Sequence, residues 1–102
     1  MQEITVAKIG EIKQGGRKIV NVAGNIIAVF NIADKYYAIE NVCPHQAGPV
    51  GEGEIRDGDN VVCPLHEWMF NIKTGASPEF PGISVKTFPV KVEGGEVKVV
   101  ID

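Results

Sequence analysis

The sequence predicts a small all-β protein, an antiparallel sandwich or partly open barrel with a loop-rich β subdomain inserted in it. Three observations support this prediction. The apolar residues fall in short runs rich in valine and isoleucine, which favour strands. Glycine-containing residue pairs typical of tight hairpins separate several of these runs. No segment of ten or more residues shows the 3.6-residue period of an amphipathic helix.

The expected strands are short and are distributed along the whole chain. Segment 26–30 is the longest uninterrupted apolar run, whereas segments 90–92 and 97–99 alternate apolar and polar residues, as a half-exposed hairpin does. The full set of expected strands is 5–9, 18–22, 26–30, 36–39, 60–63, 68–72, 90–92 and 97–99. Turns are expected at Gly24 and Asn25, at 33–35, at Asp57 and Gly58, and at Gly94 and Gly95.

Glycine and proline are concentrated in the middle of the chain. Eleven of these eighteen residues lie in the 39 residues of segment 44–82, and only seven lie in the other 63 residues. Such residues mark turns and loops. We therefore expect one domain over residues 1–102, with a subdomain at 43–82 inside it.

Composition argues against several classes of protein. Ten Lys and Arg against thirteen Asp and Glu give a net charge of -3, so no basic surface for nucleic acid is expected. The longest apolar run is far shorter than the about 20 residues of a membrane span, so no membrane partner is expected. The first residues lack the basic start and apolar stretch of a secretory signal, which makes a cytoplasmic location the expectation.

The two cysteines and two histidines form two matched pairs. His45 follows Cys43 by two positions, His66 follows Cys63 by three, and a proline comes directly after each cysteine. Seventeen residues separate His45 from Cys63. Two short loops, each with one thiolate and one imidazole, can close around a metal site from opposite sides.

Four interpretations of these residues are open. A disulfide between Cys43 and Cys63 is disfavoured by the expected cytoplasmic location. Buried cysteines with two surface histidines do not account for the matched pairing. A structural zinc ion would accept the four ligands, although zinc fingers usually pair Cys with Cys and His with His. A 2Fe–2S cluster with two thiolates on one iron and two imidazoles on the other fits both ligand types.

The two pairs, with their order and spacing, resemble the Rieske iron–sulfur motif. The resemblance extends beyond the pairs to Trp68 and Phe70, to Thr74 and Gly75, and to the proline-bearing stretch 78–82, which covers the cluster in similar proteins. It implies a Rieske-like fold in which segment 43–82 is the cluster-binding subdomain. It also implies one 2Fe–2S cluster per chain, with four ligands: Cys43, His45, Cys63 and His66.

Two departures distinguish the sequence from the respiratory-complex branch of this family. That branch has an additional cysteine in each loop, and the two form a disulfide, where this sequence has Gly48 and Leu65. It also has a serine and a tyrosine whose hydroxyls bond to sulfur, where this sequence has Trp68 and Phe70. The sequence is therefore more similar to the Rieske-type ferredoxins that serve as electron shuttles in bacterial ring-hydroxylating dioxygenase systems.

The resemblance implies a one-electron carrier and not an enzyme by itself, since the sequence offers no candidate acid–base pair. The implied partners are a flavin-containing, NADH-dependent ferredoxin reductase and a terminal oxygenase of aromatic hydrocarbon catabolism, each bound transiently by a monomer. One alternative is the small Rieske-like subunit of an NADH-dependent nitrite reductase. The alternative from another class is a structural zinc-binding module.

The net negative charge lies around the metal-bearing segment. Residues 44–82 contain six acids and two bases, whereas the rest of the chain contains seven acids and eight bases. We expect this segment to steer a basic partner toward the two histidines, with a solvated acidic surface as the alternative. The expected apolar contacts beside the histidines are Pro49, Val50, Leu65 and Pro81.

Overall fold

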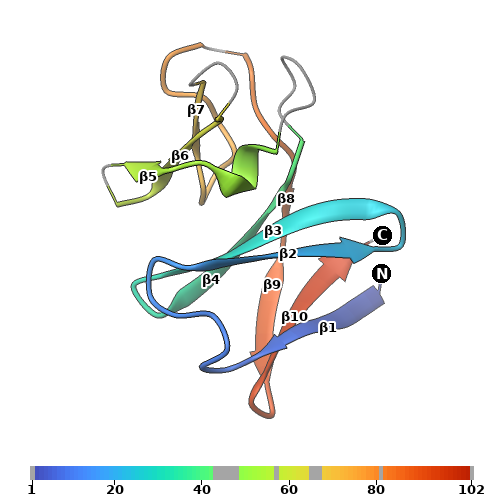
Figure 1. The fold of residues 1–102 in the computed structure, drawn as a ribbon. Helices are drawn as coiled ribbons and strands as arrows, with labels where there is room; N and C mark the ends of the chain where they lie inside the picture. Colours follow the sequence, from blue (N-terminus) through green and yellow to red (C-terminus); the bar gives the residue numbers. More distant parts are fainter. Residues whose placement is uncertain (1, 43–48, 57, 65–67, 81, 102) are drawn as a thin grey trace.

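The computed structural model describes residues 2–42, 49–56, 58–64, 68–80 and 82–101. Within these ranges the chain forms antiparallel β-strands joined by turns, with one short 3₁₀ helix, which confirms the expected all-β fold class. Nothing helical in the described ranges is long and apolar enough to cross a membrane. The two ends of the chain lie side by side, where Gln2 pairs with Ile101 (Figure 1).

The strands form three sheets, which we call terminal, central and upper (Figure 1). The terminal sheet contains, in spatial order, β1 (Gln2–Lys8), β10 (Glu96–Ile101) and β9 (Val90–Glu93). The central sheet contains β2 (Arg17–Val22), β3 (Asn25–Ile32), β4 (Lys35–Glu40) and β8 (Thr87–Phe88). The upper sheet contains β5 (Ile55–Arg56), β6 (Asn60–Val62) and β7 (Met69–Asn71), and the 3₁₀ helix η1 (Val50–Glu52) precedes it.

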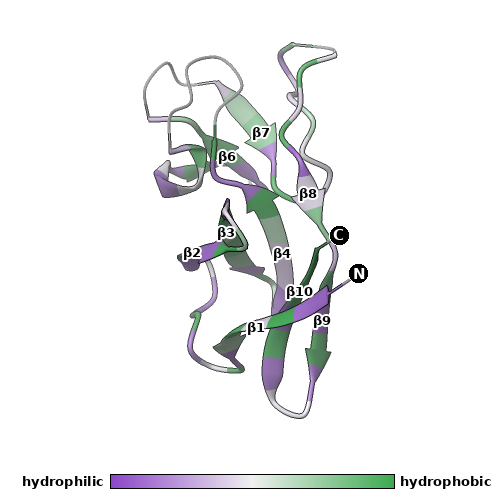
Figure 2. Cartoon of the chain, turned by 90° about the vertical axis from the view of Figure 1, so that its right-hand side faces the viewer, coloured by the Kyte–Doolittle hydropathy of each residue, from purple (hydrophilic) through white to green (hydrophobic). Residues whose placement is uncertain are grey.

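Strand β3 is buried on both of its faces and separates two hydrophobic cores. Ile27 and Val29 pack into the lower core, between the central and terminal sheets. Ala28 and Phe30 point to the opposite face and pack into the upper core, between the central and upper sheets. The apolar run is therefore continuous over residues 27–30 because both faces of the strand need apolar side chains there, whereas Ile26 at its start is exposed. Figure 2 shows hydrophobic residues concentrated on β3, β4 and β10.

The terminal and central sheets are joined at one end and open at the other. Only Pro89 separates β8 from β9, and because proline has no N–H to donate, the chain leaves the central sheet there and enters the terminal sheet. At the other end, β1 and β2 share no backbone ladder in the described chain, so the barrel stays open. Lys18 on β2 crosses this opening, since its Nζ donates to the Val6 carbonyl at 2.8 Å and to the Glu11 carboxylate.

The β2–β3 hairpin turns one residue earlier than the sequence predicted. Val22 pairs with Asn25, so the turn residues are Ala23 and Gly24, with φ of 51° and 84°. The turn of the β3–β4 hairpin begins where the sequence predicted but is one residue shorter, because Lys35 already belongs to the strand. The register follows from which side chains must enter each core, and the turn residues adapt to it.

The remaining expected hairpins are present. Gly94 and Gly95 form the two-residue turn between β9 and β10. Gly58, with φ of 82°, lies in the connection between β5 and β6, while Asp57 falls outside the described residues. Strand β8 was not predicted, because two residues are too short to show a period. The upper sheet lies within segment 43–82, and the division of the chain into a domain with a subdomain stays a prediction.

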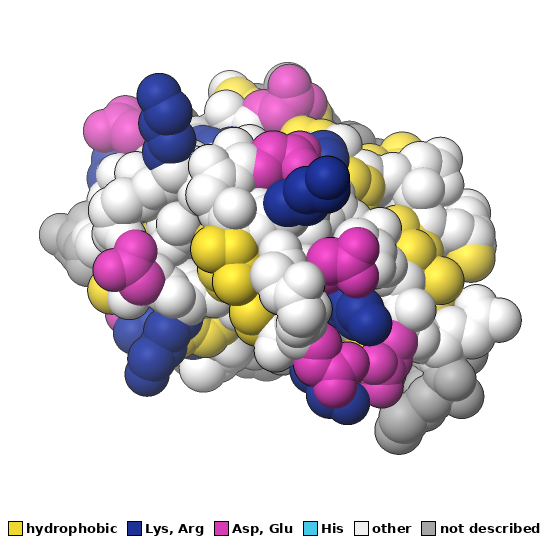
Figure 3. All heavy atoms as spheres, turned by 90° about the horizontal axis from the view of Figure 1, so that it is seen from below, with side chains coloured by type: hydrophobic (Ala, Val, Ile, Leu, Met, Phe, Trp, Pro, Cys, Tyr) yellow, Lys and Arg dark blue, Asp and Glu magenta, His cyan; other side chains and the backbone are white. Residues whose placement is uncertain are grey.

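Charges of both signs are mixed on the face opposite the upper sheet (Figure 3). On the terminal sheet, Lys91 lies 3.2 Å from Glu3 and 3.6 Å from Glu93, and Lys98 lies 3.5 Å from Glu93. Exposed ion pairs of this kind contribute little to stability. They do balance the charge locally, so this sheet offers no strongly acidic surface.

At Gly53, between η1 and β5, the backbone passes close to that of Val62 at the end of β6. Gly53 follows η1 with φ of -79° and ψ of 174°, an extended conformation that any residue can adopt. A methyl group placed on its Cα would overlap the Val62 carbonyl and contact Pro64. The position therefore requires glycine because of space and not because of backbone conformation.

The Gly53→Ala protein should be destabilised by about 3 kcal/mol, since a backbone carbonyl cannot move aside as a side chain does. The control is Gly24→Ala, where nothing lies within 4 Å and only the left-handed φ costs about 1 kcal/mol. Thermal melting followed by circular dichroism separates the two, at about 4–8 °C per kcal/mol. Equal melting temperatures for the two variants would contradict the close packing at Gly53.

Candidate metal centre

The second predicted ligand pair lies in the hairpin between β6 and β7. Cys63 directly follows β6, its side chain is fully buried, and it is a free cysteine, which argues against the disulfide interpretation; Cys43 lies outside the described residues. Its backbone N–H donates to the Trp68 carbonyl at 2.7 Å and ties the two ends of loop 63–68 together. His66 belongs to this loop but lies outside the described residues.

The first predicted pair belongs to a loop that is closed in a similar way. Asn41 follows β4 and is buried, with 7% of its surface exposed. Its backbone N–H donates to the Ile26 carbonyl at 2.8 Å, and its Oδ1 accepts the Gly51 N–H at 2.6 Å. These bonds tie the ends of segment 41–51 to each other and to the central sheet. Cys43 and His45 belong to that segment and lie outside the described residues.

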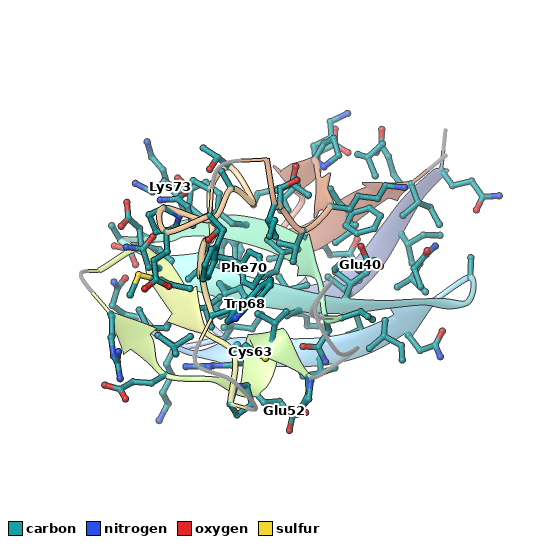
Figure 4. All side chains as sticks on the ribbon, turned by 90° about the horizontal axis from the view of Figure 1, so that it is seen from above. Glu40, Glu52, Cys63, Trp68, Phe70 and Lys73 are labelled. Atoms are coloured by element: carbon teal, nitrogen blue, oxygen red, sulfur yellow. The ribbon has the colours of Figure 1, made fainter. Side chains whose placement is uncertain are left out.

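The closed ends of the two loops lie against each other. The Val62 N–H donates to the Glu54 carbonyl at 2.9 Å, and Gly53 packs against Val62. We call these closed loop ends, formed by Asn41, Gly51, Gly53, Val62 and Cys63, the frame of the metal centre. The frame fixes Cys63 relative to the segment that follows the first loop. Seen from above, Cys63 lies between Glu52 and Trp68 (Figure 4).

Arg17, at the start of β2, reaches this frame from the central sheet. Its Nη1 donates to the carbonyl of Gly51 at 3.1 Å and to that of Gly53. Its guanidinium lies over the Phe30 ring, 5.4 Å from the centroid. Burial lowers the pKa of Arg17 from its usual value.

Sequence reasoning missed both Asn41 and Arg17. Asn41 could have been recognised in the sequence, because it is a polar residue between an apolar strand and the first cysteine. Arg17 could not have been recognised, because it lies 34 and 36 residues along the chain from the two carbonyls that it binds. Such a contact follows only from the pairing of the strands.

An apolar wall stands beside the second loop. The rings of Trp68 and Phe80 have centroids 4.7 Å apart, and Phe80 is 39% exposed. Ser77 Oγ accepts the Phe80 N–H at 3.2 Å, and Glu79 Oε1 accepts the Met69 N–H at 3.3 Å. These bonds hold the first part of the proline-bearing stretch against β7.

The expected apolar docking contact at Val50 is wrong. Val50 is fully buried in the upper core with Phe70 and Cys63, because η1 packs against β3 and β6 and turns this side chain inward. Pro49 is half-buried, and the other two expected contacts, Leu65 and Pro81, lie outside the described residues. Exposed Phe80 is the apolar side chain that the structure places at this surface instead.

Some acids of the metal-bearing segment form ion pairs with cations and others do not. Arg56 lies 3.8 Å from Glu54, and Lys73 lies 4.0 Å from Asp59. Glu52 is exposed on η1 and takes part in none of the ion pairs within the described ranges. Glu79, whose Oε1 accepts the Met69 N–H, takes part in none of these ion pairs either, and the other two acids of the segment, Asp57 and Glu67, lie outside these ranges.

This frame fits a metal centre with soft ligands. The Cys63 thiol is buried and free of a disulfide where the closed ends of the two loops meet. Thiolate and imidazole are ligands that both zinc and iron–sulfur sites accept. Two loops with one of each ligand match a 2Fe–2S cluster that has two thiolates on one iron and two imidazoles on the other.

Comparison with known proteins identifies the family of this chain. Residues 2–89 match the family model described as the Rieske [2Fe-2S] domain. The 3-phenylpropionate/cinnamic acid dioxygenase ferredoxin subunit of Escherichia coli is 33% identical over 98 residues, which cover 95% of this chain and 92% of that protein.

Solved structures share the whole fold. The ferredoxin of carbazole 1,9a-dioxygenase from Nocardioides aromaticivorans has a TM-score of 0.91 and 29% identity, and the match covers 100% of both chains. A chain from a complex of reduced oxygenase and oxidized ferredoxin in carbazole 1,9a-dioxygenase has a TM-score of 0.86 and 33% identity, over 95% of this chain and 100% of that chain. This protein is therefore a member of the Rieske [2Fe-2S] domain family, which confirms the resemblance seen in its sequence.

Proposed function

We propose that this chain is a one-electron carrier, the ferredoxin component of an oxygenase system, and that it binds one 2Fe–2S cluster. The proposed ligands are Cys43, His45, Cys63 and His66. The observation that carries the proposal is the frame of the metal centre. Two loops, each with one cysteine and one histidine, are closed at their ends by hydrogen bonds and are packed together.

A bound cluster of this type supplies one-electron redox chemistry at a higher potential than a plant-type, all-cysteine cluster does. The residues of the chain hold the ligands and exclude water. Cys63 is fully buried, and Trp68 and Phe80 form an apolar wall beside its loop. The loop ends are tied by hydrogen bonds, and a preorganised site avoids the cost of rearrangement at each transfer.

The proposed partners follow from chemistry and from the relatives. NADH donates its electrons as a hydride, so a flavin-containing reductase is needed to release them singly to a one-electron carrier. The Escherichia coli relative is a dioxygenase ferredoxin subunit, and a similar chain belongs to a complex of ferredoxin with oxygenase, which supports a terminal oxygenase as acceptor. Use of NADH supports a cytoplasmic location, and a shuttle between two partners supports a monomer that is no enzyme by itself.

The small subunit of a nitrite reductase is the alternative within the same fold. A fixed subunit would stay with its partner through purification, whereas a shuttle would be isolated alone. We favour the shuttle because the Escherichia coli relative, at 33% identity, is a dioxygenase ferredoxin subunit.

We expect docking at the end of the molecule that carries the two loops, because electron transfer weakens steeply with distance. Phe80 offers an exposed apolar contact there, and Glu52 offers a negative charge that no described cation balances. A shuttle must dissociate quickly, so the interface should bury less than about 1,200 Å² in total.

Purified protein should contain about two iron and two acid-labile sulfide per chain, as a 2Fe–2S cluster requires. Cys63→Ser should lose the cluster and much of its stability, because metal binding and folding are linked. Val61→Thr is the control, since it buries a hydroxyl in the same core without removing a ligand, and it should keep its iron. Elemental analysis that finds one zinc and no iron in the wild-type protein would favour the zinc module.

The midpoint potential should lie near the lower end of the Rieske range, at about -150 mV, because Trp68 and Phe70 carry no hydroxyl to donate to sulfur. Phe70→Tyr should raise the potential if the ring keeps its buried place. Phe88→Tyr adds the same hydroxyl to the lower core and should leave the potential unchanged. A wild-type potential above about +100 mV in a voltammetric titration would refute the argument.

Reduction by the cognate reductase should slow between low and high salt, because the Debye length falls from about 10 Å at 0.1 M to about 3 Å at 1 M. Glu52→Lys should lower the association rate more than Glu96→Lys, since Glu96 lies on β10 in the terminal sheet. Stopped-flow bleaching over a salt series measures both variants. Equal rates without salt dependence would mean that the acidic segment is only a solvated surface.

A further inference from the structure

Arg17 is a half-buried cation without a carboxylate partner in the described part of the chain. None of the ion pairs between described residues involves it. The other half-buried cations differ, since Lys18 pairs with Glu11 and Lys98 pairs with Glu93. Withdrawing a charge from water without a counter-charge is unfavourable, so such an arrangement calls for a compensating role.

The groups that hold Arg17 belong to the frame of the metal centre. Gly51, which accepts one of its hydrogen bonds, is itself bound by Asn41 at the closed end of the first loop. Gly53, which accepts the other, packs against Val62, the residue before Cys63. The guanidinium therefore bonds directly to the closed end of the first loop, and Gly53 and Val62 connect it to Cys63, where the second loop begins.

The guanidinium is also held in a fixed position. Its Nη1 is anchored on two carbonyls, and the Phe30 ring supports the group at 5.4 Å from its centroid. Phe30 is fully buried in the upper core and cannot move away. The positive charge consequently stays at one place beside the two loops.

We propose that Arg17 is a positioning residue of the metal centre, and that its fixed charge raises the midpoint potential of the bound cluster. This inference rests on the proposed function. Two ferric ions, two sulfides and two thiolates sum to zero charge, so one added electron makes the site negative. A cation nearby stabilises that negative charge, and a partly buried one is screened less by salt than an exposed one.

The lowered pKa of Arg17 is consistent with this arrangement. Its cause is burial, which disfavours the charged form, and no carboxylate among the described residues opposes that effect. The guanidinium still remains protonated at neutral pH, because its usual pKa is far above that range.

The test compares four variants of the cluster-loaded protein. Arg17→Gln and Arg17→Met remove the charge, and Arg17→Lys keeps it. Lys18→Gln is the matched control, because it removes one positive charge and two hydrogen bonds from the next residue of the same strand, at the opening between β1 and β2. Iron and sulfide content is measured first, and the midpoint potential then follows from spectroelectrochemical titration at fixed pH and salt.

We expect the potential to fall in both neutral variants, to stay near the wild-type value in Arg17→Lys, and to stay unchanged in Lys18→Gln. Potentials of the neutral variants that equal that of Lys18→Gln would overturn the proposal. If the neutral variants retain no cluster, the cluster content and midpoint potential of Arg17→Lys test the proposal. A loaded Arg17→Lys protein with the wild-type potential supports the role of the charge, and loss of the cluster from it as well assigns Arg17 to packing alone.

The wild-type protein separates this inference from the proposed function. If it contains no 2Fe–2S cluster, the proposed function fails, whatever the variants do. If it is loaded and dithionite bleaches it, the variants test Arg17 alone.

Discussion

Strand β3 has to be apolar on both faces, and the rest of the structure is arranged around it. Its lower face supports the core shared with the terminal sheet, and its upper face supports the core shared with the upper sheet. The upper sheet has strands of only two or three residues, which would not be stable alone. It is held by packing against Phe30 and its neighbours, so the metal-bearing part of the chain depends on the lower part for its stability.

Hydrogen bonds to backbone groups fix the ends of the two ligand loops. The second loop is closed by a bond between two peptide groups, and the first by the Asn41 amide on the Gly51 N–H. Between the two loops, Gly51 lies so close to Ala28 and Asn41, and Gly53 so close to the Val62 carbonyl, that neither glycine has room for a methyl group. These close contacts and hydrogen bonds hold the loop ends in place, so the loop ends form a base on which the ligands can be carried.

Periodicity and turn residues predicted most of the fold, and the failures have physical reasons. Segment 26–30 was recognised as a strand, but its apolar continuity alone did not reveal that it serves two cores. The first hairpin was placed one residue late, because Gly24 and Asn25 resemble a turn pair while the core sets the register. At the site, spacing pointed to the four ligands, of which the described residues include only Cys63. Arg17 and the inward turn of Val50 depend on contacts between distant strands, which no local pattern encodes.

The lack of hydroxyl donors to sulfur and the presence of a nearby cation act on the potential of such a centre in opposite directions. Without hydroxyl groups at Trp68 and Phe70, the sulfur atoms lose donors that would favour the reduced state. A fixed cation restores part of that effect from outside the ligand loops, through space and through the carbonyls of Gly51 and Gly53. A carrier must have a potential between those of its donor and its acceptor. Because Arg17 belongs to β2, a substitution there can shift the potential without changing a ligand or the length of a loop. This separates the residues that bind the metal from a residue that adjusts its potential.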